Sequence, residues 1–279
     1  MAKKVLARIK DLSVTYQTRI GPVSAVDHVS FDIYKGEILG LVGESGCGKS
    51  TLGKALLRMI DPPGEISSGE IIFDGENIMN YDEKQLRDFR GRRASMIFQD
   101  PMTSLNPVQR IDDHLIEAIK VHEPQTSREP ALTRSKKMIE RLGIGTNRLI
   151  SYPHQLSGGM RQRVMTGIGL ILNADLIVAD EATTSLDVIV EAKLADQLRE
   201  IRGEFGVSLL MITHNIALVA EMADRIAVMY AGHMIEIGDI YKVFENPKHP
   251  YTQGLLASVP NIRFDEQENY TKCQVNHRT

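Results

Sequence analysis

The chain has 279 residues, which suits one large α/β domain or a domain with a substantial insert. Its hydrophobic fraction of 42% and charged fraction of 25% are ordinary for a globular protein in water. A net charge of −3 argues against a protein that binds nucleic acid mainly through its charge. The two cysteines, Cys47 and Cys273, make neither a disulfide framework nor a zinc site, which fits a reducing compartment.

The first residues, MAKKVLARIKDLSV, contain no long apolar core and no small-residue cleavage site, so they do not read as a secretory signal. No run in the chain approaches the roughly 18 apolar residues of a membrane-spanning helix. We therefore expect a cytoplasmic protein, which could still dock on a membrane protein through its surface.

The first part of the chain reads as strands that lead into a glycine-rich loop. VLARIKDLSVTY and AVDHVSFDIY show partial alternation of apolar and polar residues. EILGLVG, residues 37–43, is a short apolar strand that runs into glycines. Residues 49–60 predict a helix that ends before Pro62, and GEIIFDGENI beyond it reads as a further strand.

From about residue 99 to residue 159, helical patterns replace the strands. Apolar residues recur on two predicted helix faces: Ile111, Leu115 and Ile119 on one, and Leu132, Met138, Ile139 and Leu142 on the other. After this insert the α/β alternation resumes. LIVADE, VSLLMIT, RIAVMYAG and HMIEIG read as strands, and residues 188–202 and 215–222 read as helices.

These elements predict a four-part organisation. Residues 1–98 form the first part of an α/β core together with a β-subdomain, and residues 99–159 form a helical subdomain. Residues 160–245 complete the core, and residues 246–279 supply a C-terminal helix and a polar tail.

The strongest motif is GESGCGKST, which matches the phosphate-binding loop G-x-x-x-x-G-K-[ST] with a strand before it and a helix after it. Its glycines let backbone N–H groups turn toward phosphate oxygens, at a helix N-terminus that favours an anion. Lys49 would reach the β- and γ-phosphates and Ser50 would ligate Mg²⁺. The predicted nucleotide-binding residues of this loop are Gly43, Glu44, Ser45, Gly46, Cys47, Gly48, Lys49, Ser50 and Thr51.

LIVADE, residues 176–181, combines four apolar residues with two acids, which indicates a buried strand with carboxylates at its carboxyl end. Open α/β sheets place their ligands at that end. Asp180 suits a Mg²⁺ ligand acting through water, and Glu181 suits a base that accepts a proton from an attacking water. Taken alone, the two acids could instead cap the next helix.

Two other residues follow candidate strands. His214 ends VSLLMIT and Gln99 follows SMIF. By itself the histidine would more often be a capped or solvated residue, and the glutamine would be an ordinary loop residue. They gain weight jointly, because each lies at the end of a predicted sheet strand.

LSGGMRQR, residues 156–163, reads as a loop that opens into a helix, the kind of element that binds an anion. The phosphate loop already forms a complete phosphate site, so this second loop needs an anion from elsewhere. In order and spacing, GESGCGKST, Gln99, LSGGMRQR, LIVADE, Ser185–Asp187 and His214 resemble the nucleotide-binding subunits of ABC transporters. The resemblance covers about residues 5–260, and LSGGMRQR is its most specific element.

The resemblance implies an α/β fold: a P-loop NTPase, RecA-like core with an N-terminal antiparallel β-subdomain and a helical insert. It also implies two ATP molecules held between two such domains, with Ser157, Gly158 and Gly159 facing the γ-phosphate of the partner's ATP. Tyr16 would stack on adenine, although a strand aromatic packed in a core is the alternative. Gln99 would contact Mg²⁺ and the attacking water, Asp187 would link the two sites, and His214 would contact the γ-phosphate and orient the water.

A narrower resemblance concerns DPMTSLNPV, residues 100–108, and NPKHPYTQGLLASVP, residues 246–260. Both resemble the importer branch for di- and oligopeptides, nickel and some oligosaccharides. This implies two permease subunits, a second ATPase subunit that is identical or a sister, an extracytoplasmic binding protein, and a peripheral position on the cytoplasmic face of the membrane. A plain amphipathic helix is the alternative interpretation of HPYTQGLL.

The chain departs from the family pattern at Ala182, where proline is usual, and at Asn215, where aspartate is common. Neither change removes a phosphate or metal contact, so we expect activity to survive. Cys273 alone in the tail cannot supply the four thiolates of the iron–sulfur centre that many members carry. A soluble ABC ATPase of DNA repair or translation, and an exporter ATPase, are the alternative functions.

Overall fold

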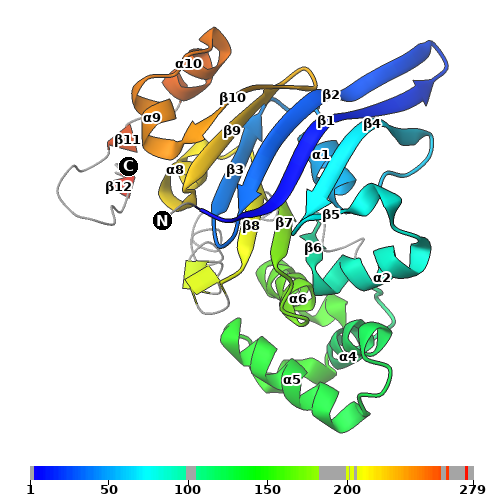
Figure 1. The fold of residues 1–279 in the computed structure, drawn as a ribbon. Helices are drawn as coiled ribbons and strands as arrows, with labels where there is room; N and C mark the ends of the chain where they lie inside the picture. The colour runs from blue at the N-terminus through cyan, green and yellow to red at the C-terminus, as the bar shows by residue number, and fades with distance from the viewer. Residues whose placement is uncertain are drawn as a thin grey trace. The chain divides into compact units, whose positions relative to one another are not determined.

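The computed structural model describes residues 3–98, 105–181, 199–200, 202–203, 206–258, 262–263 and 274–275. The chain divides into two compact units. The first unit combines Met1–Asn80 with Ser208–Thr279, and the second is Tyr81–Val207 (Figure 1). Within the described segments we find no helix that is both long and apolar enough to cross a membrane.

One sheet of the first unit is antiparallel throughout. Its strand order is β2-β1-β4-β5, formed by β1 (Val5–Thr18), β2 (Gly21–Tyr34), β4 (Gly64–Phe73) and β5 (Glu76–Asn77). Apolar side chains of β1 such as Ile9, Leu12 and Val14 are fully buried. This sheet corresponds to the predicted β-subdomain.

The other strands of the first unit carry the phosphate loop. β3 (Ile38–Gly43) runs parallel to both β8 (Ser208–Ile212) and β9 (Arg225–Tyr230), and β10 (His233–Asp239) is antiparallel to β9. Every residue of β3 and β8 is buried, which explains their continuous apolar sequences.

The helices of this unit are α1 (Lys49–Leu56), α8 (Ile216–Met222), α9 (Ile240–Glu245) and α10 (Pro250–Ala257), with a 3₁₀ turn, η1, at Ile78–Asn80. The short strands β11 (Ile262–Arg263) and β12 (Gln274–Val275) pair with each other. α1 ends at Leu56, earlier than the predicted Ile60. The cause is local: Arg58 takes a positive φ of 51°, and the N–H of Met59 folds back to the carbonyl of Lys54 at 2.9 Å.

The second unit pairs β6 (Ala94–Ile97) in parallel with β7 (Leu176–Asp180), and its other described elements are helical. Its helical elements are α2 (Glu83–Arg92), α4 (Ile111–His122), α5 (Arg128–Arg141), α6 (Gly158–Leu170) and the 3₁₀ turns η2 (Thr146–Ile150) and η3 (Pro153–Gln155). Ile111, Leu115 and Ile119 are buried as predicted. On α5 the prediction is partly wrong, because Leu132 is half-buried and Ala131 takes the fully buried position.

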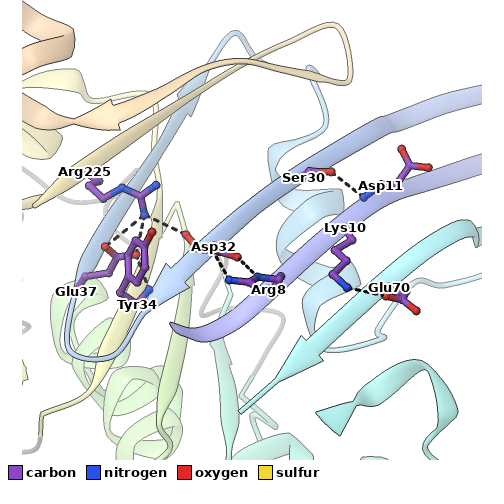
Figure 2. Close-up of polar contacts among 9 residues, drawn as sticks. All are labelled: Arg8, Lys10, Asp11, Ser30, Asp32, Tyr34, Glu37, Glu70 and Arg225. Atoms are coloured by element: carbon purple, nitrogen blue, oxygen red, sulfur yellow. Dashed lines mark hydrogen bonds and ion pairs between the residues drawn. The ribbon is translucent and has the colours of Figure 1, made fainter. Parts of the chain in front are cut away.

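A buried ion pair joins β9 to the turn between β2 and β3 (Figure 2). Arg225 Nη1 lies 3.2 Å from Oε1 of Glu37, a side chain that is only 2% exposed. The same nitrogen donates to the carbonyl of Asp32 at 3.0 Å, and the guanidinium lies 4.9 Å from the ring centre of Tyr34. Burial raises the pKa of Glu37 above its ordinary value, against the lowering effects of the Tyr34 N–H and Arg225.

Candidate nucleotide site

Two glycines of the phosphate loop occupy positions that no other residue fits. Gly43 has φ of 153°, and a Cβ there would collide with the carbonyl oxygen of Met229. Gly48 has φ of 104°, and a Cβ there would collide with the carbonyl oxygen of Ala25. The loop therefore packs backbone to backbone against β2 and β9, which fixes its path.

The middle of the loop is open, while its ends are buried. Glu44, Ser45 and Gly46 are exposed, and Cys47 and Lys49 are buried. Burial raises the pKa of the Cys47 thiol, outweighing the nearby Lys49. A neutral, buried thiol is a poor nucleophile, which agrees with the interpretation of Cys47 as a small filler.

Lys49 folds its side chain over the loop. Its Nζ donates to the carbonyl oxygens of Gly43 at 2.9 Å and Glu44 at 2.8 Å, and lies 3.8 Å from Cys47 Sγ. The side chain belongs to a residue that is only 4% exposed. These partners are neutral, so they orient the ammonium without cancelling its positive charge.

The N-terminus of α1 adds to this positive field. Gly48, the residue before the helix, has a left-handed backbone and no side chain that could cap the first N–H groups. The first turn of α1 contains no acidic residue. Because helix N-termini attract anions, the loop combines a cationic side chain with a helix end that is suited to phosphate.

His214 leaves the sheet at the edge where the phosphate loop begins. Leu41 of β3 pairs with Ile212 of β8, and the N–H of Thr213 donates to the carbonyl of Leu41 at 3.2 Å. The two parallel strands therefore end side by side, one leading to Gly43 and the other to His214. His214 is an exposed residue at this edge.

Tyr16 lies in β1, paired with Val23 of β2 and Gly64 of β4. Its ring packs against Gly64, where an added Cβ would come within 2.6 Å of Cε1. The residue is half-buried. One side of the ring therefore has a packing role, and the exposed remainder is what adenine could contact.

Asp180 is the last residue of the second unit's β7, whose five residues are all buried, and Glu181 follows it directly. Asp180 is 5% exposed, and Glu181 is half-buried with a positive φ of 46°. The strand prediction for LIVADE is confirmed. The positive φ at Glu181 is a feature that the sequence did not indicate.

The loop at LSGGMRQR opens α6. The Ser157 side chain caps the helix by accepting from the N–H of Met160 at 3.3 Å. Ser157 and Gly158 are exposed, and a Cβ on Gly158 would meet nothing within 4 Å. The hydroxyl proton of Ser157 is not used by this cap, because the oxygen acts only as acceptor.

Two predicted site residues, Gln99 and Asp187, lie outside the described residues, as do Ala182 and Cys273. The phosphate loop, Tyr16 and His214 belong to the first unit. Asp180, Glu181 and the loop at residues 156–163 belong to the second.

Two known protein families match this chain. Residues 26–184 match the family described as ABC transporter. The chain belongs to the ABC transporter family. Residues 235–276 also match the C-terminal region of the oligopeptide/dipeptide transporter family, which confirms the narrower resemblance.

Similar curated ABC proteins carry peptide-transport names. The oligopeptide transport ATP-binding protein OppD of Bacillus subtilis is 42% identical over 95% of this chain and 75% of its own length. The dipeptide transport ATP-binding protein DppD of the same organism is 44% identical, over 95% and 80%. DppD of Escherichia coli is 42% identical, over 94% and 80%.

Solved structures agree on the ABC fold. The ATP-binding cassette MJ0796, solved as a dimer in a post-hydrolysis state bound to ADP and Pi, has a TM-score of 0.76 at 24% identity, covering 84% of this chain and 99% of its own. The cbiO1 protein of Clostridium perfringens, part of an ABC transporter complex, has a TM-score of 0.73 at 26% identity, covering 88% and 92%. The predicted fold class is confirmed.

Asn215, a departure from the common ABC pattern, keeps the structural role that aspartate would have. Its side chain caps α8 by accepting from the N–H of Leu218 at 3.2 Å. Asparagine and aspartate are equally good in this role.

Two contacts of ABC motif residues were not predicted from sequence. Arg163 of LSGGMRQR donates through Nη1 to the carbonyls of Leu142 at 3.0 Å and Gly143 at 3.1 Å, so it satisfies the C-terminus of α5. The hydroxyl oxygen of Tyr251, in the HPYTQGLL segment, accepts from the N–H of Glu44 in the phosphate loop at 2.9 Å. Both contacts join residues that are far apart in the sequence, so no local pattern indicated them.

Proposed function

We propose that this chain is the ATP-binding and hydrolysing subunit of an ABC importer that takes up peptides or related solutes. The observation that carries the proposal is the phosphate loop, in which Lys49 meets an uncapped helix N-terminus. The peptide-transport names of the relatives and the match at residues 235–276 support the importer branch over an exporter or a soluble ATPase.

ATP binds at the phosphate loop, with its β- and γ-phosphates held by Lys49 and by backbone N–H groups of the loop. Tyr16 stacks on the adenine. Ser50, Gln99 and Asp180 would hold Mg²⁺, which prefers such oxygen ligands and would supply positive charge beside the phosphates.

Hydrolysis uses Glu181 as the base that accepts a proton from the attacking water. His214 contacts the γ-phosphate and orients that water, and Gln99 reports the nucleotide state to the helical segment. The strained backbone of Glu181 and the exposed position of His214 at the end of β8 support these roles.

Two such subunits, identical or sister chains, close on two ATP molecules. Ser157, Gly158 and Gly159 at the N-terminus of α6 donate to the partner's γ-phosphate, and Asp187 links the two sites. Two permease subunits and an extracytoplasmic binding protein complete the importer. The chain is then peripheral on the cytoplasmic face of the membrane.

Lys49→Ala tests the proposal, with Lys54→Ala as a matched control. Both lysines lie in α1, but Lys54 pairs with the exposed Asp61 at 3.5 Å. Lys49→Ala removes charge-assisted hydrogen bonds worth about 1.5–3 kcal/mol each, so ATP affinity should fall at least about tenfold and turnover should stop. Lys54→Ala should bind and hydrolyse ATP like the unmodified chain.

The measurements are ATP titration of the purified chain and ATP-dependent peptide uptake by the importer in vesicles. Normal ATP affinity in Lys49→Ala would reject the phosphate loop as the nucleotide site. Normal hydrolysis without peptide uptake would reject the peptide-import part of the proposal.

A further inference from the structure

The segment Asn246–Tyr251 connects β10 to the phosphate loop through hydrogen bonds. The Glu236 carboxylate on β10 accepts from the N–H groups of Lys248 at 2.8 Å and His249 at 3.1 Å. Burial alone would raise the pKa of Glu236. Hydrogen bonds to the carboxylate, including those from these two N–H groups, outweigh burial, so the pKa lies below its ordinary value and the carboxylate stays charged. The strand thus holds the start of α10 by two charge-assisted hydrogen bonds.

The start of α10 is also fixed within itself. Nδ1 of His249 accepts from the N–H of Tyr251 at 3.1 Å, and Pro250 occupies the first turn, where its missing N–H is not needed. These contacts set the direction in which Tyr251 leaves the helix. Its ring then packs on Tyr230 of β9, with ring centres 4.6 Å apart.

At its far end, this segment reaches the phosphate loop through a hydrogen bond from the N–H of Glu44 to the Tyr251 hydroxyl oxygen at 2.9 Å. The two residues are 207 positions apart in the sequence. The peptide chain of Glu44 is held on its other side as well. Its carbonyl accepts from Lys49 Nζ at 2.8 Å and from the N–H of Cys47 at 3.2 Å. Glu44 therefore connects Tyr251 to the ammonium that faces the phosphates.

We propose that Tyr251 is a positioning residue for nucleotide binding, which fixes the backbone at Glu44 and through it the ammonium of Lys49. The C-terminal segment of this importer branch thereby contributes to ATP affinity, although it lies outside the phosphate loop. The inference rests on the proposed function, since it assigns the loop to ATP.

Tyr251→Phe tests this directly, because it keeps the ring on Tyr230 and removes only the hydroxyl. Without that acceptor the loop loses one hydrogen bond to its backbone, and we expect the Kd and KM for ATP to rise about three- to tenfold. The kcat of the assembled importer should stay within about twofold, and the melting temperature of the nucleotide-free chain should not change. Tyr230→Phe is the matched control, because it keeps the ring pair and leaves the Glu44 contact in place.

A second variant distinguishes positioning from general loosening. Proline at position 44 has no N–H, so Glu44→Pro removes the same hydrogen bond from the other side. If the two residues act through that bond, adding Tyr251→Phe to Glu44→Pro should not weaken ATP binding further. If Glu44→Pro does not fold, the two tyrosine variants decide the question.

Three results would overturn the inference: a KM for ATP unchanged in Tyr251→Phe, an equal effect of Tyr230→Phe, or a fall in melting temperature and kcat without a change in KM. The unmodified chain separates this failure from that of the proposed function. If it binds and hydrolyses ATP while Tyr251→Phe behaves identically, only the positioning role is wrong. If it does not bind ATP, the proposed function itself fails.

Discussion

Glu181 takes a left-handed backbone conformation, with φ of 46°, although it has a full side chain. This conformation costs a residue with a Cβ about 1–2 kcal/mol, and such strain is concentrated at functional sites. Glu181 directly follows the buried strand β7. The carboxylate is therefore directed by the backbone, and a test substitution must preserve the side-chain shape.

Glu181→Gln meets this condition, because the amide keeps the shape and loses the base. We expect ATP hydrolysis to fall about 10²–10⁴-fold. ATP affinity should change by no more than about 0.5 kcal/mol, since no phosphate contact is removed. The variant should accumulate as an ATP-bound dimer, seen by size-exclusion chromatography with ATP. Hydrolysis at the unmodified rate would show that another group is the base.

At the scale of the elements, the buried pair Arg225–Glu37 joins β9 to the β3 entrance, and hence holds the strand that leads to the phosphate loop. Breaking such a pair leaves a buried charge without its partner, which costs more than the pair itself contributes. Arg225 also donates a hydrogen bond to the Asp32 carbonyl and lies over the Tyr34 ring, so its loss affects the end of β2 too.

Arg225→Met should lower the free energy of unfolding by about 3 kcal/mol at neutral pH, the lower end for a broken buried pair because Arg225 reaches solvent in part. The effect should shrink as pH falls. The folded-state pKa of Glu37 is already raised by burial, so its protonated form favours folding, and that contribution is lost as pH rises through the folded pKa. Urea denaturation at acidic and neutral pH measures both effects.

Lys10→Ala is the control for this ion-pair variant. Lys10 Nζ on β1 lies 3.4 Å from Glu70 Oε2 on the neighbouring strand β4, but the two side chains are 51% and 49% exposed. An exposed pair contributes at most about 1 kcal/mol, so the free energy of unfolding should change little. An equal loss in both variants would show that burial of Glu37 is not the cause.

The sequence predicted elements best where one local pattern decides them. β3, β7 and β8 are apolar because they are buried along their whole length. The helix α2 was not predicted, although Asp82 and Gln85 form a capping box that signals its start. The end of α1 was placed four residues too late because the backbone reversal at Arg58 has no marker in the sequence.

The candidate site likewise has parts that local sequence patterns predict and parts that they do not. The phosphate loop could be predicted because glycine, lysine and serine at fixed spacing determine its local shape. The collision of a Gly48 Cβ with Ala25 and the hydrogen bond from Glu44 to Tyr251 could not be predicted, since both depend on residues brought together by the tertiary fold. Local patterns do not encode such long-range contacts.

At the scale of the whole molecule, one phosphate loop and one LSGGMRQR loop make each chain half of a reaction site in the proposed dimer. The α6 N-terminus suits an anion from another molecule, because Ser157 and Gly158 are exposed. Arg163, in the second turn of this helix, donates hydrogen bonds to carbonyl oxygens at the end of α5. Hydrolysis should therefore depend on pairing with a second subunit, while nucleotide binding by one chain should not.

Gly158→Asp separates these two properties. A side chain at Gly158 meets nothing within 4 Å, and an acid in the first turn suits the helix dipole, so the fold should tolerate it. ATP affinity of the monomer should change by no more than about 0.5 kcal/mol. In the closed dimer the new carboxylate would face the γ-phosphate, and like charges about 4 Å apart repel by about 4 kcal/mol at an effective dielectric constant near 20. Closure should then weaken by nearly three orders of magnitude, with hydrolysis and transport falling alongside.

The matched control for this charge is Gly158→Asn, which has nearly the same shape and no charge. ATP titration of the monomer and ATPase activity of the assembled importer should be measured for both variants. We expect Gly158→Asn to retain much more activity than Gly158→Asp, because only the acid repels the phosphate. Lost ATP binding by the Gly158→Asp monomer would assign the loop to the chain's own nucleotide. Equal activity of the two variants would mean that position 158 faces no phosphate, and the proposed sharing of ATP between two chains would have to be abandoned.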